Sequence, residues 1–377
     1  SGTPDGSEVL TVAPVDDGLY DAVGNEASTT QSNNTATLND QAVPIISSVF
    51  LALDNSTIAV TFNEAVYNTN GGSGSVEASD FFFSISGGTA TLSHAAPTSF
   101  SVSGNVYTLG IGISGTPAGT EVLTVVPVVN GIYDGAGNEA STTQSNNTAT
   151  LIDLTAPTIS SVTTSKENGS YKVGEVIAIT ITFSEAVTVT GTPQLTLETG
   201  STDAVVNYTS GTGTTTLTFN YTVAAGENSS DLDYASTGAL ALNSGTIRDA
   251  AGNNATLTLA SPGASNSLGA NKALVVDGVV PATPTGLVAT PASAQNVLTW
   301  TANGEGDLAS YKVYGGTSSS PTTLLTTVTS GQTYTHSSLT NGTLYYYRIS
   351  AVDDAGNETS KTSDVSARPH DPAGNYS

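Results

Sequence analysis

The sequence predicts an all-β chain made of several β-sandwich modules. Short segments alternate between apolar and polar residues, which is the period of a strand with one buried face. Helical periodicity is nearly absent, and we expect at most one helical turn, near residues 230–233. One stretch recurs at an offset of 113 residues, about the length of one β-sandwich. A tight Asp-x-x-Gly-Asn turn occurs five times, at residues 21–25, 134–138, 249–253, 353–357 and 371–375.

Residues 1–40 read as the C-terminal part of an incomplete module. The tetrapeptide Ser-Gly-Thr-Pro at residues 1–4 returns at 114–117, and residues 24–38 are identical to residues 137–151. We expect either an excised piece of a longer protein, which the absence of Met and of a signal peptide favours, or a donated set of strands that completes a neighbouring chain.

The first whole module is expected at residues 41–153. Residues 56–62 alternate between apolar and polar residues and place Ile58, Val60 and Phe62 on one buried face. Further strands are expected at residues 81–85, 106–109 and 122–125, between turns rich in Gly, Ser and Asn.

A second module with the same plan is expected at residues 154–277. Here residues 176–183 alternate, with Ile177, Ile179, Ile181 and Phe183 facing inward. Strands are also expected at residues 195–197, 216–221 and 274–276.

Residues 278–368 have a different character. They carry the only tryptophan, Trp300, and a Gly-Thr-x-Tyr sequence that leads into a long strand. This segment resembles a fibronectin type III domain over its whole length. The resemblance implies that Trp300 belongs to strand B and that the hydroxyl of Tyr345 bonds to backbone upstream of it. Period-two spacing puts Tyr345, Tyr347, Ile349 and Ala351 on one face. Residues 369–377 are a tail or the start of a next module.

Residues 1–277 are similar to the tandem bacterial Ig-like repeats of very large surface adhesins. A Phe-x-Glu-Ala-Val motif ends the second predicted strand of both whole modules, at residues 62–66 and 183–187, and an Asp-x-x-Ala-Pro linker stands at 153–157. Relatives include adhesins that tether ligands and surface filaments of gliding cells. The resemblance implies Ig-like sandwiches arranged as an elongated rod, outside the cell or on a bacterial cell surface.

Acidic side chains are expected to converge where one module meets the next. In an Ig-type sandwich, the B–C and F–G loops lie at the end where the chain enters the first strand. Hard oxygen ligands of this kind suit calcium, and three carboxylates without a cation would repel one another. The competing interpretation is that Asp and Asn only cap the turn, while Gly supplies a positive φ. The candidate calcium ligands are Asp40, Glu64, Asp134 and Asn138; Asp153, Glu185, Asp249 and Asn253; and Asp277, Asp307, Asp353 and Asn357, with Glu305 as a possible addition.

Composition excludes several functions. With 32 acidic and 8 basic residues the chain lacks the basic patch that nucleic acid requires, and the same charge disfavours anionic membranes. No run of about 18 apolar residues predicts a membrane span. Cysteine is absent, so thiolate chemistry and disulfides are excluded. His94, His336 and His370 are scattered, and the carboxylate pair Asp231 and Asp233 sits in a short turn without a sugar-binding aromatic platform.

The sequence therefore predicts no catalysis. We expect a structural stalk segment of a large secreted or cell-surface adhesin or surface filament, stiffened by calcium at its junctions. Its partners would be neighbouring modules of the same long chain, with identical chains in a filament as a further option. Two alternatives remain open at this point. One is a spacer in a secreted polysaccharide-degrading enzyme, and the other is a filament subunit linked by strand donation.

Overall fold

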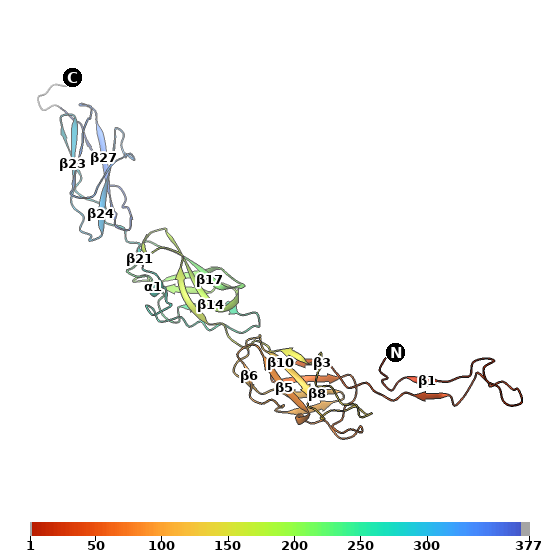
Figure 1. The fold of residues 1–377 in the computed structure, drawn as a ribbon. Coiled ribbons are helices and arrows are strands. Elements are labelled where there is room, and N and C mark those ends of the chain that lie inside the picture. Colours follow the sequence, from red (N-terminus) through yellow and green to blue (C-terminus); the bar gives the residue numbers. More distant parts are fainter. Residues whose placement is uncertain (1, 371–377) are drawn as a thin grey trace. The chain divides into compact units, whose positions relative to one another are not determined.

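The computed structural model describes residues 2–370. The chain divides into two compact units, Ser1–Thr155 and Ala156–Ser377. Nearly all the regular secondary structure of the described part is β-strand, as the alternating pattern predicts (Figure 1). The fifth Asp-x-x-Gly-Asn sequence, at 371–375, lies outside the described residues, as does most of the predicted tail.

Residues 41–153 of the first unit form two main sheets around one core. One sheet has the strand order β3-β4-β8-β7 and the other β11-β10-β5, and a short β6-β9 ladder lies beside them. The predicted alternation is confirmed, because Ile58, Val60 and Phe62 are each at most 2% exposed. The elements are β3 (Ile46–Leu51), β4 (Thr57–Phe62), η1 (Ala78–Asp80), β5 (Phe81–Ser86), β6 (Thr91–Leu92), β7 (Phe100–Ser103), β8 (Val106–Gly110), β9 (Ile113–Ser114), β10 (Val122–Pro127) and β11 (Thr148–Thr150).

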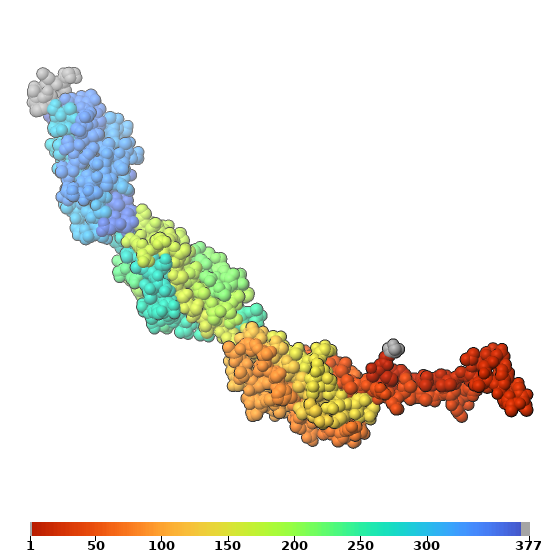
Figure 2. All heavy atoms as spheres, in the orientation of Figure 1, coloured from red at the N-terminus to blue at the C-terminus, as the bar shows by residue number. Residues whose placement is uncertain are grey.

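Residues 2–40 of the same unit contain one two-stranded ladder. Strand β1 (Val9–Thr11) pairs with β2 (Thr35–Thr37) in antiparallel register. No second sheet covers this ladder within the described residues, and Figure 2 shows the segment in red as a narrow strip of atoms.

Residues 156–277 of the second unit form a larger core. The long sheet has the order β12-β14-β17-β16-β15-β19, β20 pairs with β14, and a small sheet has the order β13-β21-β18. Ile177, Ile179, Ile181 and Phe183 are at most 2% exposed, as predicted. The elements are β12 (Ile159–Thr164), β13 (Gly169–Lys172), β14 (Val176–Thr190), β15 (Gln194–Leu197), β16 (Ala204–Ser210), β17 (Thr214–Thr222), β18 (Asn228–Ser229), β19 (Leu240–Ala241), β20 (Thr246–Arg248), α1 (Leu268–Asn271) and β21 (Leu274–Asp277).

Two expectations for this module are wrong. Residues 230–233 contain no helical turn. Strand β18, just before them, pairs with β21, and the Leu232 N–H donates to the Leu274 carbonyl at 2.7 Å rather than to a helical partner. The helix forms instead at α1, where the Ser267 side chain accepts a hydrogen bond from the Ala270 N–H and caps the first turn.

The second wrong expectation concerns the end of β14. The Phe-x-Glu-Ala-Val motif does not end this strand, which runs on to Thr190. The register with β17 is interrupted between Thr182 and Val187, and the strand then pairs with β20. Glu185 therefore lies on an irregular stretch inside β14 rather than in a loop.

Residues 278–370 form two sheets with a third core. The sheets have the orders β22-β23-β26 and β25-β24-β27-β28. Trp300 follows β23 and packs edge-on against Tyr311, with 5.3 Å between the ring centroids. The Tyr345 hydroxyl accepts a hydrogen bond from the Thr340 N–H at 3.2 Å, so the expected upstream backbone bond is confirmed. The strands are β22 (Val288–Ala292), β23 (Gln295–Thr299), β24 (Leu308–Gly316), β25 (Leu324–Val328), β26 (Thr333–His336), β27 (Tyr345–Asp353) and β28 (Val365–Ala367).

Candidate metal site at the Asp-x-x-Gly-Asn turns

The four described copies of the turn share one local hydrogen-bond pattern. In the copy at 134–138, Asp134 Oδ1 accepts from the Asn138 N–H at 2.8 Å and Oδ2 accepts from Asn138 Nδ2 at 2.7 Å. Gly137 has φ +93°, which favours glycine. The copies that begin at Asp21, Asp249 and Asp353 make the same two bonds. The shape of the turn is thus explained by hydrogen bonds to the Asp side chain and by the positive φ of Gly, as the capping interpretation holds.

The turn at Asp134 also takes part in a carboxylate cluster. Carboxylate oxygens of Asp40, Glu64 and Asp134 all lie within 4.8 Å of one another. Asp40 precedes the first strand of the module, Glu64 follows β4 by two residues, and Asp134 belongs to the turn, so three separate segments meet. Asp134 is fully buried and the other two are half-buried.

Asn138 holds the turn against the entering segment. Its Nδ2 donates to the backbone carbonyl of Asp40 at 3.3 Å as well as to Asp134 Oδ2. The amide nitrogen rather than the amide oxygen therefore faces this pair of residues. Of the predicted set, Asp40, Glu64 and Asp134 are the residues whose carboxylate oxygens gather closely enough to hold a metal ion together.

The cluster carries unfavourable electrostatics. Burial, followed by the negative charges of Asp134 and Asp40, raises the pKa of the Glu64 carboxyl above its usual range. Two carboxylates about 5 Å apart repel by roughly 3 kcal/mol at an effective dielectric constant near 20. The ion pairs of Lys312 with Glu358 and of Arg348 with Asp364 lie elsewhere in the chain. A divalent cation would reverse the sign of this interaction, and three hard oxygens suit calcium.

The second predicted set is divided between the two units. In the second unit, carboxylate oxygens of Glu185 and Asp249 lie within 4.8 Å of each other. Asp249 is 5% exposed and holds Asn253 through the turn. Asp153 belongs to the first unit, where its Oδ1 accepts from the Thr155 N–H at 2.8 Å.

The third predicted set is arranged differently. Carboxylates of Asp277, Asp307 and Asp353 do not gather within 4.8 Å as those of Asp40, Glu64 and Asp134 do. Burial, followed by the charges of Asp353 and Asp307, still raises the pKa of Asp277. Asn357 donates from Nδ2 to the Asp277 carbonyl at 2.9 Å, the counterpart of the bond from Asn138 to Asp40.

A lysine contacts the turn at residues 353–357. Lys172 Nζ donates to the Gly356 carbonyl at 3.1 Å, and the Val173 N–H donates to Asn357 Oδ1 at 3.1 Å. The amide oxygen predicted to ligate a metal is therefore engaged by backbone. Glu305 is engaged as well, because its Oε1 accepts from the Ala282 N–H at 2.6 Å. The sequence analysis missed Lys172, and only the scarcity of cations in the chain could have drawn attention to it.

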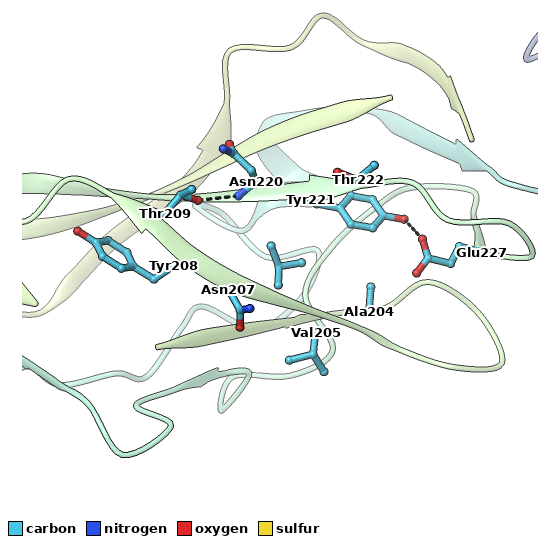
Figure 3. A pocket seen from close by; sticks show the side chains of 10 residues that line it. Ala204, Val205, Asn207, Tyr208, Thr209, Asn220, Tyr221, Thr222 and Glu227 are labelled. Atoms are coloured by element: carbon cyan, nitrogen blue, oxygen red, sulfur yellow. Dashed lines mark hydrogen bonds between the residues drawn. The ribbon is translucent and has the colours of Figure 1, made fainter. Parts of the chain in front are cut away.

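A groove of about 430 Å³ lies between β16 and β17 (Figure 3). The acidic residue in this groove is Glu227, and its carboxylate serves the fold: Oε2 accepts from the Tyr221 hydroxyl at 2.7 Å and from the Ala224 N–H at 2.8 Å. In the pair Asp231 and Asp233, the carboxylate of Asp233 also serves the fold, because it accepts from the Tyr234 and Gly263 N–H groups. We assign no chemistry to either place.

The histidines have local roles. His336 Nδ1 lies 3.1 Å from the Tyr347 hydroxyl among three tyrosine rings, and burial lowers its pKa. His94 Nδ1 lies 3.1 Å from the Ser93 hydroxyl on the surface. His370 is exposed at the end of the described residues.

Comparisons with known proteins identify one domain. Residues 282–367 match the family model of the fibronectin type III domain, which confirms the expectation for this part. Exoglucanase A of Cellulomonas fimi is 40% identical over 99 residues, which cover 25% of this chain and 11% of the exoglucanase. An Fn3-like protein from Clostridium thermocellum is 33% identical over 25% of this chain and 95% of that chain, with a TM-score of 0.21. Domains of titin are 14% identical over 87% of this chain and 99% of that chain, with a TM-score of 0.34.

The fibronectin type III domain thus follows other β-modules in one chain. In the described residues, the helices are all too short or too polar to cross a membrane.

Proposed function

We propose that this chain is a non-catalytic spacer segment of an extracellular protein and that calcium binds Asp40, Glu64 and Asp134. The convergence of these three carboxylates from three segments supports the proposal most strongly. Their charges destabilise the junction unless a cation is present, and this makes metal binding favourable. Asp40, Glu64, Asp134 and further backbone or water oxygens approach the six to eight ligands that calcium takes.

Calcium at this position would act mechanically. It would tie residues 2–40, through Asp40, to the end of β4 and to the turn of the module at 41–153. Extracellular modules bind calcium with dissociation constants of about 10⁻⁴–10⁻³ M, so the junction would be stiff outside a cell and loose after chelation. The ion's role is to neutralise and bridge the carboxylates.

We favour a stalk of a surface adhesin or filament as the larger context. The near-literal repeat at an offset of 113 residues indicates growth by module duplication, which lengthens a spacer without adding new chemistry. Such a stalk has neighbouring modules as its partners and keeps a distal ligand-binding part away from a bacterial cell surface.

A spacer in a secreted polysaccharide-degrading enzyme is the second candidate. The 40% identity to exoglucanase A over 99 residues favours it, although the match covers 11% of that protein. The parent reading frame separates the two candidates. A catalytic or carbohydrate-binding domain beside this segment supports the enzyme spacer, whereas many further copies of the 113-residue unit support the stalk.

The calcium proposal is tested by isothermal titration of the chain with calcium chloride. Glu64→Gln keeps the side-chain volume and removes one charge, so we expect it to bind one calcium ion fewer per chain than the unmodified protein. Asp54→Asn is the matched control, because Asp54 is exposed and bonds only to Ser56 nearby. Equal stoichiometry and affinity in Glu64→Gln and the unmodified chain would refute the assignment.

A further inference from the structure

The chain contains almost the same sequence in two settings. Leu123 is fully buried in the module at 41–153, whereas its counterpart Leu10 is 53% exposed. Leu151 is 2% exposed and its counterpart Leu38 is 37% exposed. Val125 is fully buried and its counterpart Val12 is 64% exposed. Residues 2–40 thus expose to solvent the apolar face that is buried in the module at 41–153.

The ladder in residues 2–40 is already formed. Val9 pairs with Thr37 in β1 and β2, which repeats the pairing of Val122 with Thr150 in β10 and β11. In the whole module, β10 also pairs along its other edge with β5, from Val122 opposite Ser86 to Pro127 opposite Phe81. The corresponding edge of β1 has no strand beside it in the described residues. An exposed edge of this kind is a template for strand addition.

The hydrogen bonds of Glu121, compared with those of Glu8, independently indicate that residues 2–40 lack a covering segment. Glu121 Oε2 accepts from the Ala118 N–H at 3.0 Å, and Oε1 accepts from the Thr89 and Ala90 N–H groups at 2.9 and 3.1 Å. Its counterpart Glu8 keeps the local bond, to the Asp5 N–H at 3.0 Å, but is exposed. For Glu8, N–H donors like those of Thr89 and Ala90 would have to come from the front of a module, by which we mean a segment that corresponds to residues 41–113.

We propose that residues 2–40 are a docking surface for the front of another repeat, a segment of the sequence type of residues 41–113. This front adds a β5-like strand to the edge of β1, donates two N–H groups to Glu8 and covers Leu10, Val12 and Leu38. A second copy of this chain does not fit, because its own front is already filled by β10 and β11.

The test extends the full chain with a duplicate of residues 41–113 placed before Ser1. Hydrogen exchange measured by mass spectrometry then reports the amides of β1 and β2. We expect their protection to rise at least tenfold and to approach that of β10 and β11. A control duplicate that carries Phe81→Asp and Phe83→Asp should leave β1 and β2 unprotected, because these two side chains are at most 1% exposed in the native module.

A second pair of variants keeps the test decisive if the duplicate folds poorly. Leu10→Asp should leave thermal unfolding of the unextended chain unchanged and should lower the first transition of the extended chain. Unchanged exchange of β1 in the extended chain, with the duplicate itself protected, would overturn the proposal. Protection of β1 that grows with concentration of the unextended chain would overturn it too, since the occupant would then be a second copy.

Discussion

Asp134 shows how one side chain serves both a turn and a binding site. Its Oδ1 and Oδ2 atoms accept the bonds that shape the turn, and the same carboxylate stands within 4.8 Å of Asp40 and Glu64. Asp21 makes the same turn in the uncovered segment, so the turn is encoded locally. What differs between the two copies is the neighbourhood, because only the whole module brings other carboxylates to the turn.

Protons and calcium should compete for Glu64. Burial, followed by the charges of Asp134 and Asp40, raises its pKa, and calcium binds the deprotonated form. Calcium affinity should therefore fall as pH drops through this raised pKa, and titration calorimetry near neutral pH and at about pH 5 measures the difference. Without calcium, the raised pKa means that ionised Glu64 destabilises the folded state as pH rises above the ordinary glutamate range. Glu64→Gln should weaken the pH dependence, and an unchanged dependence would assign it to other groups.

Glu358 should control the acid stability of the fibronectin type III domain. Burial acts to raise its pKa, but hydrogen bonds from Lys312, Ser350 and Tyr314 outweigh burial and lower the pKa from 4.5 to about 2. Such a carboxyl stabilises the folded state above its unfolded pKa, and this contribution is lost as pH falls from 4.5 toward about 2. Glu358→Gln should cost about 1.5–3 kcal/mol at neutral pH.

Urea unfolding followed by the fluorescence of Trp300 measures this change, because the chain has one tryptophan and it lies in this domain. The difference between Glu358→Gln and the unmodified chain should shrink at acid pH. A difference that stays constant from neutral to acid pH would contradict the role given to the charge.

At the level of elements, alternation predicted strands well and strand ends poorly. The faces of β4 and β14 follow directly from period two, because burial of one face is a property of the segment itself. The end of β14 depends on β20, which supplies a new pairing partner beyond the irregular stretch near Glu185. The position of the short helix α1 depends on its N-cap residue Ser267, and apolar periodicity does not reveal an N-cap.

The candidate site was predictable where it rests on topology. Sandwich connectivity brings Asp40, Glu64 and Asp134 to one end of the module, and the recurring motifs identify them. The arrangement around Asn357 was not predictable, because Lys172 at the end of β13 and Val173 just after it contact this turn from 184 residues away in sequence.

Lys172→Gln should loosen the turn at 353–357. The variant loses the bond from the ammonium group to the Gly356 carbonyl, which we expect to be worth about 1 kcal/mol because both residues are part-buried. Hydrogen exchange of residues 353–357 should rise, while exchange of the core strand β24 stays unchanged. Lys361→Gln is the control, since Lys361 lies over the Tyr314 ring, 4.2 Å from its centroid. Equal exchange at 353–357 in both variants would show that the lysine does not hold the turn.

Glu121→Gln should destabilise the module at 41–153. Glu121 is fully buried and accepts four backbone N–H bonds, from Thr89, Ala90, Ala118 and Thr120, so the neutral amide would lose charge-assisted bonds worth about 1.5–3 kcal/mol in total stability. Gly88 leaves room for it, because a Cβ there would stand 2.0 Å from Glu121 Oε1. Glu8→Gln is the matched control and should have no effect on urea unfolding. A loss in both variants, or in neither, would contradict this account.

For the whole chain, stability is divided among separate hydrophobic cores. The described residues form three clusters of buried side chains, one in residues 46–151, one in 162–276 and one in 298–351. Each module buries its own apolar face, so modules can be repeated without redesign of a shared core. Charged residues are few and mostly acidic, with a net charge of −24, which favours solubility and leaves cations as the natural ligands of the carboxylate cluster.

Crystallography of the chain grown with calcium tests the central claim most directly. We predict an anomalous density peak at about 2.3–2.6 Å from one carboxylate oxygen each of Asp40, Glu64 and Asp134. Carboxylates that stand apart with no ion between them at millimolar calcium would contradict the proposal.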